Sequence, residues 1–224
     1  MNAAVAERSE AHTETLSDWI APSRTAVVVI DIQVDFASPD GSLGRAGVDM
    51  NVVAPAVAAA ERLVNLARAA GAPVVFVCLQ TAAALDSPAW RERTRRRGSN
   101  PSEDSAVCRA GQRGAEFVGP TPQPGDLVID KIRYSGFFGT NLNAGLKALG
   151  VDTMIVCGLT TECCIDSTVR DAFHLDYHVF IASDACAAYE PEVHAASLKN
   201  LELNCAILVT VDEVRAAWAE RTHG

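Results

Sequence analysis

The sequence predicts an α/β fold, a three-layer αβα domain built around a six-stranded parallel sheet. From residue 25 onward, short runs rich in β-branched residues alternate with segments whose apolar residues recur at helical spacing, as in repeated β–α units. The runs are continuously apolar, which is expected of strands covered by helices on both faces. The chain has 224 residues, of which 49% are hydrophobic, and this size fits one such domain.

The β–α units can be assigned in chain order. The expected strands span residues 25–30, 73–79, 126–131, 152–157, 178–182 and 206–210. Glycine and proline terminate helices, so the first expected helix spans 53–70, before Gly71 and Pro73, and the second spans 142–149, before Gly150. A third helix begins near Ile165, and Pro191 fits the opening turn of a fourth.

Two regions stand outside this repeat and divide the chain. Residues 1–22 are expected to form an N-terminal arm or a short docking helix, and 23–224 form the domain itself. Within the domain, residues 82–125 make an insertion too long for an ordinary loop, which predicts a lid or an interface segment. Its run of arginines between Arg91 and Arg97 fits either a solvated face or subunit contact, or a site for an anionic substrate.

Composition restricts the partners and the compartment. The formal charge of −9 opposes non-specific binding to nucleic acid or to anionic lipid. The first 20 residues lack a basic start followed by an apolar core, so no secretory signal is expected, and nothing in the composition predicts a membrane partner. Seven cysteines, an odd number without metal-like spacing, indicate free thiols in a reducing cytoplasm.

Polar residues follow three of the expected strands where ligands bind in an open parallel sheet, at the carboxyl ends. Asp31 ends the first strand, Lys131 ends the third, and the fourth continues through Gly158 into the segment GLTTECCIDSTVRDA. An acid, an amine and a thiol are therefore expected to converge in one pocket. Taken singly, Asp31 also fits a helix cap or an ion pair, and Lys131 a solvated side chain.

Cys164 differs from the cysteines expected to be inert core residues, because it falls where a strand gives way to a helix. At a helix N-terminus the backbone N–H groups and the helix dipole favour the thiolate, and a nearby ammonium would lower the thiol pKa further. Cys164 is therefore the expected nucleophile. Its neighbour Cys163, about 100° around the helix, is the alternative.

These motifs resemble those of the isochorismatase-like cysteine hydrolases. The resemblance runs from about residue 25 to 218 and rests on VVVIDIQVDF with Asp31, the strand ending in Lys131, and GLTTECCIDSTVRDA with Cys164. It implies a Rossmann-type strand order, a Cys-Asp-Lys triad and a cis peptide bond between Leu159 and Thr160. It also implies an oxyanion hole formed by the backbone N–H groups of Thr160 and Cys164.

The resemblance further implies a reaction. Asp31 would take the thiol proton, Lys131 would orient the acid and stabilise the thiolate, and Cys164 would attack an amide-type carbonyl to form a thioester and release ammonia. Similarity is strongest to the ureido and carbamoyl amidohydrolases, whose small linear substrates include ureidoacrylate, biuret and N-carbamoylsarcosine. No cofactor and no metal are expected, because the Asp-x-His motif of metal-binding members is replaced by LQTAAALD.

Several residues are candidates for binding such a substrate. Aromatic side chains suit a planar ureido group, polar ones would orient it, and an arginine could hold a substrate carboxylate. The candidates are Phe36, Gln33, Gln80, Arg133, Tyr134, Ser135, Phe138 and Thr161.

Other functions remain open at this point. Maleamate- or nicotinamide-type amidases belong to the same family, and a non-catalytic member could bind a small molecule without turning it over. A cofactor-binding oxidoreductase lacks its G-x-G-x-x-G motif here, and the adjacent Cys163 and Cys164 fit a thiol redox protein poorly. The resemblance also implies a homo-oligomer, a dimer or a tetramer.

Overall fold

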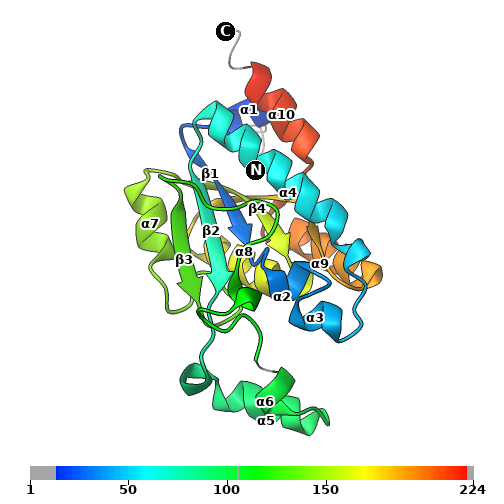
Figure 1. Ribbon diagram of the computed structural model, residues 1–224. Helices are drawn as coiled ribbons and strands as arrows, with labels where there is room; N and C mark the ends of the chain where they lie inside the picture. The colour runs from blue at the N-terminus through cyan, green and yellow to red at the C-terminus, as the bar shows by residue number, and fades with distance from the viewer. Residues whose placement is uncertain (1–13, 105, 221–224) are drawn as a thin grey trace, which may run out of the picture.

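A six-stranded, entirely parallel sheet forms the centre of the protein in a computed structural model that describes residues 14–104 and 106–220 (Figure 1). The strand order is β3-β2-β1-β4-β5-β6, so the order reverses between β1 and β4. The strands are β1 Thr25–Ile30, β2 Val74–Leu79, β3 Leu127–Lys131, β4 Thr153–Leu159, β5 His178–Ala187 and β6 Ile207–Val209. The predicted fold and all six predicted strands are confirmed.

Strand β5 is longer than the sequence predicted. The apolar run was expected to end at residue 182, but the strand continues to Ala187 and pairs again with β4 at Gly158 and Leu159. The register between the two strands shifts between Val156 and Gly158, and the second half of β5 contains polar residues. Because these polar residues interrupt the apolar run, the sequence predicted the end of β5 too early.

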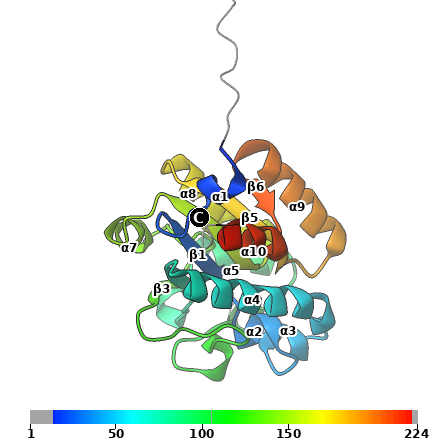
Figure 2. The same cartoon turned by 90° about the horizontal axis from the view of Figure 1, so that it is seen from above.

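Helices cover both faces of the sheet (Figures 1 and 2). One face carries α4, and α10 packs against α4. The opposite face carries α7, α8 and α9. The bounds are α4 Ala54–Ala70, α7 Leu142–Ala148, α8 Asp166–His174, α9 Pro191–Asn204 and α10 Val211–Glu220. The central strands β1, β2 and β4 are covered on both faces, which explains why they are buried along their whole length.

Helix α4 shows how the sequence determines an element boundary. The side chains of Ala60, Leu63 and Ala67 are buried on one face of the helix, in agreement with their helical spacing. Gly71 follows in the left-handed conformation, with φ 72°, and its N–H donates to carbonyls of the last turn. Glycine adopts this conformation at no steric cost, so the helix ends there as predicted.

The segment before the sheet is docked on the domain. Residues 1–13 of the expected arm lie outside the described part of the chain. Helix α1, Leu16–Trp19, packs against α10, and Ile20 behind it is fully buried. The indole Nε1 of Trp218 donates a hydrogen bond of 2.7 Å to the Ile20 carbonyl. This contact joins the two ends of the domain.

The insertion projects from the end of the molecule toward which the strands point (Figure 1). It contains η2 Ala83–Leu85, α5 Pro88–Arg96, α6 Pro101–Asp104 and η3 Arg113–Ala115. An ion pair between Arg109 and Asp86, both largely buried, closes it with two hydrogen bonds of 2.7 and 2.8 Å. Asp35 in α2, Val34–Ala37, anchors it to the domain by accepting from the Cys108 N–H at 2.7 Å.

Two short elements follow α2 on the same side, α3 Ser42–Arg45 and η1 Met50–Val52. Among residues 14–104 and 106–220, no helix combines the length and the apolar character needed to cross a bilayer.

Candidate active site

The three predicted chemical groups meet at the carboxyl ends of the strands, beside the point where the strand order reverses. Asp31 directly follows β1, Lys131 is the last residue of β3, and Cys164 follows β4 on the other side of β1. Ligands bind at this position in open α/β sheets because the flanking loops diverge there. The sheet topology therefore brings together residues more than 100 positions apart in the sequence.

The Asp31 backbone is held in an unusual conformation. Its φ of 50° lies in the left-handed region, which residues other than glycine seldom adopt. Its N–H still donates to the Val77 carbonyl at 2.9 Å, so the strand pairing continues to this residue. Apart from the ion pair with Lys131, neither carboxylate oxygen has a hydrogen-bond partner in the described structure. The carboxylate thus keeps accepting capacity at a buried position.

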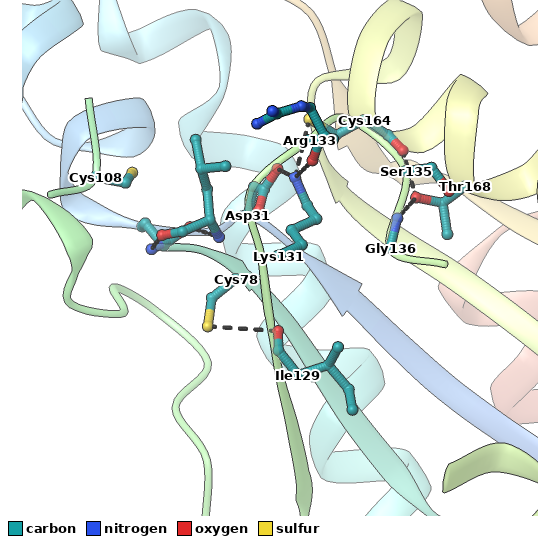
Figure 3. Close-up of polar contacts among 12 residues, drawn as sticks. Asp31, Cys78, Cys108, Ile129, Lys131, Arg133, Ser135, Gly136, Cys164 and Thr168 are labelled. Atoms are coloured by element: carbon teal, nitrogen blue, oxygen red, sulfur yellow. Dashed lines mark hydrogen bonds and ion pairs between the residues drawn. The ribbon is translucent and has the colours of Figure 1, made fainter. Parts of the chain in front are cut away.

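The Lys131 ammonium occupies the centre of the group (Figure 3). It lies 2.7 Å from Asp31 Oδ2, 3.0 Å from the Arg133 carbonyl and 3.4 Å from Cys164 Sγ. An ammonium has three N–H donors, and these three acceptors use all of them. Burial lowers the pKa of Lys131, but the Asp31 carboxylate and Cys164 raise it by more, so the ammonium is charged at neutral pH.

Cys164 lies in a single wide turn that precedes α8. This π-helical turn, η4, spans Thr161–Ile165, and the Leu159–Thr160 peptide bond before it is cis. The Cys164 carbonyl accepts a hydrogen bond of 2.6 Å from the Thr168 hydroxyl, which in turn accepts one of 2.9 Å from the Gly136 N–H. The turn that carries Cys164 is thereby tied to the loop that follows Lys131.

The thiol of Cys164 differs from the sequence prediction in its protonation. Its contact with the Cys163 thiol, burial and the Asp31 carboxylate raise the pKa of Cys164 well above the ordinary value, outweighing the Lys131 ammonium, which lowers it. The expected depression of the Cys164 pKa is therefore wrong. The physical reasons are the contact with the Cys163 thiol, burial, and the nearby carboxylate, which disfavours a second negative charge.

The group opens into a cavity of about 390 Å³. Its wall is mostly apolar, as is usual for small-molecule sites. Of the residues singled out from the sequence, Asp31, Phe36, Lys131, Arg133, Tyr134, Thr160, Cys163 and Cys164 line it. The site thus combines a narrow polar end with a hydrophobic body.

Three of the predicted substrate-binding residues contact the protein itself. The Gln33 amide is completely buried, donates to the carbonyls of Leu79 and Ala115 at 2.9 and 2.8 Å, and accepts from the Leu79 N–H. Ser135 donates to Asp171 at 2.5 Å, and the buried Thr161 hydroxyl lies 2.8 Å from His194 Nδ1. Their hydrogen-bonding groups are occupied, so these residues shape the site without lining its cavity.

Gln80 and Phe138 are also outside the cavity wall. Gln80 directs its amide to the Cys78 thiol at 3.9 Å, and its backbone N–H continues the pairing of β2 with β3. The Phe138 side chain is 63% exposed on the surface. For Gln80, closeness to Leu79 was misleading because successive residues of an extended chain point in opposite directions. Phe138 lies in the bends and turns that follow β3, where closeness to Lys131 in sequence does not fix the direction of a side chain.

Other cavity residues were not predicted, except that Arg93 belongs to the arginine run for which a site for an anionic substrate was one of two alternatives. The insertion contributes Ser87, Ala89, Trp90, Arg93 and Val107, which places the predicted lid or interface segment in one wall of the cavity. Tyr189 lines the cavity after the end of β5, and its hydroxyl donates to the Phe36 carbonyl at 2.8 Å. Tyr189 was overlooked because β5 was expected to end earlier. The rule that ligands bind at strand ends would have found it.

The candidate metal ligands among the described residues are His, Cys, Asp and Glu side chains. No group of three or more His, Cys, Asp or Glu side chains in them is arranged to hold a metal ion. The ionisable groups of the site are instead paired with one another, carboxylate with ammonium and ammonium with thiol.

Comparisons with known proteins agree with this architecture. An isochorismatase domain model matches residues 25–213. The ureidoacrylate amidohydrolase RutB of Methylobacterium radiotolerans is 38% identical over 193 residues, which are 81% of this chain and 74% of the relative.

Two solved structures are also similar. A cysteine hydrolase from Pseudomonas syringae pv. phaseolicola has a TM-score of 0.79 at 29% identity, over 90% of this chain and 95% of that one. The N-carbamoylsarcosine amidase of Thermoplasma acidophilum has a TM-score of 0.67 at 28% identity, over 84% and 97%. Because the family model spans the whole sheet and all three polar groups, this chain belongs to the isochorismatase family.

Proposed function

We propose that the protein is a cysteine amidohydrolase that cleaves a C–N bond of a small linear amide, ureido or carbamoyl compound. One observation carries the proposal: a single ammonium, Lys131, contacts both the Asp31 carboxylate and the Cys164 thiol, and all three residues line one cavity. This arrangement joins a nucleophile to a proton acceptor, as covalent catalysis requires. The amidohydrolases among the relatives support the same reaction class.

The first step forms a thioester. As the Cys164 sulfur attacks the substrate carbonyl carbon, the thiol proton passes to Asp31, which has free accepting capacity. The carbonyl π electrons move to oxygen, and the backbone N–H groups of Thr160 and Cys164 are proposed to hold this oxyanion. Each such donor contributes up to about 3–4 kcal/mol in a transition state.

The second step releases the nitrogen. Asp31, now protonated, donates its proton to the leaving nitrogen as the C–N bond breaks, and ammonia departs when the substrate ends in a carbamoyl group. Water then attacks the thioester while Asp31 accepts its proton. As the C–S bond breaks and the carboxylic or carbamic acid leaves, Asp31 returns that proton to the Cys164 sulfur, which restores the thiol and the carboxylate. Lys131 remains charged throughout and keeps Asp31 and Cys164 in place.

The cavity favours planar, linear substrates. Phe36, Tyr134, Trp90 and Tyr189 supply aromatic walls, and a volume of about 390 Å³ is at the small end for ligand sites. A ureido group is flat and short, so ureidoacrylate-, biuret- or N-carbamoylsarcosine-like compounds fit this description.

Self-association and a cytoplasmic location belong to the same proposal. Leu85, Tyr134 and Phe138 expose 47–63% of their surface near the insertion and the loop after β3, which suits contact with a second copy in a dimer or tetramer. All seven cysteines lie in the described part of the chain and are free thiols, as in reducing compartments.

The proposal is tested by measuring ammonia release from ureidoacrylate, biuret, N-carbamoylsarcosine, maleamate and nicotinamide without added metal. We expect release from at least one ureido or carbamoyl compound by the wild-type protein and none by Cys164→Ala. The Cys163→Ala variant is the matched control and should retain most of the activity. Release by Cys164→Ala would refute the assignment of the nucleophile, and no release from any compound would refute the reaction class.

A further inference from the structure

The charge of the cavity is opposite to that of the protein. Four strongly ionisable side chains line it: Asp31, Lys131, Arg93 and Arg133. The first two form an ion pair and cancel. The two arginines therefore leave about two positive charges in the cavity of a chain whose formal charge is −9. The site itself attracts an anion although the rest of the surface repels one.

The ion pairs within helix α5 leave the Arg93 guanidinium free to bind a ligand. The helix has one carboxylate, Glu92, which binds Arg95 and Arg96 at 2.7 Å each. These hydrogen bonds lower the pKa of Glu92 to about 2. The Glu92 carboxylate is therefore ionised and already bound by two other arginines. Within the described residues Arg93 has no ion-pair partner, and it lines the cavity.

Trp90 fixes the face of α5 that meets the cavity. Trp90 precedes Arg93 by three residues, which places both on one side of the helix, and both line the cavity. The Trp90 ring packs edge-on against Tyr134, with centroids 6.4 Å apart. Tyr134 stands three residues after Lys131. This edge-on contact ties helix α5, which carries Arg93, to the loop that follows Lys131.

Arg133 is held on the other side of this loop. Its Nη1 donates to the Ile132 carbonyl at 2.7 Å and to the Leu85 carbonyl at 3.4 Å. Both hydrogen bonds use the same nitrogen, and in the described structure Nε and Nη2 make none. A guanidinium has five N–H donors, so Arg133 retains donors for a ligand.

We propose that Arg93, together with Arg133, forms a carboxylate-binding subsite, and that the substrate is a monoanionic ureido or amide compound. Its carboxylate lies at the arginine end of the cavity and its scissile carbonyl at Cys164. This inference rests on the proposed function, and it selects carboxylate-bearing substrates over neutral ones such as biuret. Arg93 is the specificity-determining residue, because the ion pairs of α5 leave it without a charged partner among residues 14–104 and 106–220.

Binding to a protein that cannot turn over tests this inference separately from the reaction. The probes are 3-ureidopropionate and its neutral methyl ester, titrated calorimetrically into Cys164→Ala protein. We expect the acid to bind about tenfold or more tightly than the ester, since hydrogen bonds between charged groups are lost with the ester. The preference should shrink as NaCl is raised, because Arg93 is exposed.

The deciding variants carry a second substitution in the same background. Arg93→Gln should reduce acid binding about tenfold and leave ester binding unchanged, and Arg93→Lys should restore part of it. Arg91→Gln on the same helix removes the same charge outside the cavity wall and should change neither. The inference would be overturned if the acid and the ester bound equally well, or if the acid did not bind. It would also be overturned if Arg93→Gln and Arg91→Gln lost the same acid affinity. Acid preference without ammonia release by the wild type would instead refute the proposed function alone.

Discussion

The Lys131 ammonium lies 2.7 Å from an oxygen of the Asp31 carboxylate, and each residue exposes only 1% of its surface. A buried charge is costly unless a partner compensates it. The two residues therefore depend on each other, and the thiol at 3.4 Å from the same ammonium depends on both. This relationship leads to predictions for stability as well as for activity.

Removal of one partner should be more harmful than removal of both. Lys131→Met leaves the Asp31 carboxylate buried without its cation, and we expect a loss of about 3–5 kcal/mol in the free energy of unfolding. The double variant Asp31→Asn/Lys131→Met carries no buried charge and should recover part of this loss, although it should be inactive. Urea denaturation measures both. A single variant as stable as wild type would show that the pair is not buried as described.

Alkaline pH should remove a stabilising contribution of Cys164. Contact with Cys163, burial and Asp31 raise its folded pKa above the ordinary value of about 8.5, so the folded state binds the thiol proton more tightly. This contribution is complete below about pH 8.5 and is lost as the pH rises toward the folded pKa. The stability difference between wild type and Cys164→Ala should therefore shift against wild type as the pH rises above about 8.5.

The same protonation is visible directly. Thiolate absorbance near 240 nm, measured as wild type minus Cys164→Ala, should be absent at pH 7 and appear only in the alkaline range. A full thiolate signal at pH 7 would contradict the raised pKa and favour the thiolate expected from the sequence.

Acid should loosen the insertion through Asp86. The hydrogen bonds from Arg109 lower the pKa of the Asp86 carboxyl, so its contribution to stability is present above about pH 3.9 and is lost as the pH falls through the folded pKa. Asp86→Asn should expose the insertion to proteolysis at neutral pH, with a loss of about 1–3 kcal/mol. Asp40→Asn, whose partner Arg113 is exposed, is the control and should change little. Equal proteolysis of the two variants would argue against this anchor.

Gly158 should not tolerate a side chain. Its φ of 126° is open to glycine, and a Cβ would lie 2.0 Å from the Ile30 carbonyl oxygen, next to Asp31. Gly158→Ala should cost at least about 2 kcal/mol and reduce activity, because β1 and β4 must separate at the site. Gly150→Ala is a useful comparison, since its Cβ would meet no atom within 4 Å. Similar losses of stability in Gly158→Ala and Gly150→Ala would show that the effect comes from the positive φ and not from the contact with Ile30.

The sequence was sufficient for the sheet and for the polar groups at its edge, because continuous apolar runs identify buried parallel strands and Asp31 and Lys131 adjoin such runs. It was insufficient for the cavity wall. Arg93 and Trp90 lie in an insertion without β–α periodicity, so only the fold shows that α5 turns back toward the site.

Protonation and hydrogen bonding escaped prediction for a different reason. The pKa of Cys164 depends on the contact with Cys163, on burial and on two opposite charges, and sequence position reports only that the groups converge. Gln33 looked free to meet a ligand, but its amide satisfies backbone groups of Leu79 and Ala115. Such contacts depend on how the insertion folds back onto the domain, and no local sequence pattern predicts this.

The central claim, covalent catalysis by Cys164, is tested most directly by trapping its acyl intermediate. Wild-type protein is mixed with the compound that releases ammonia fastest, quenched in acid within milliseconds to seconds, and digested for peptide mass spectrometry. The account predicts an acyl group on the Cys164 sulfur of the peptide that contains both adjacent cysteines, and its absence in Cys164→Ala but not in Cys163→Ala. Acylation that persists in Cys164→Ala and disappears in Cys163→Ala would contradict it.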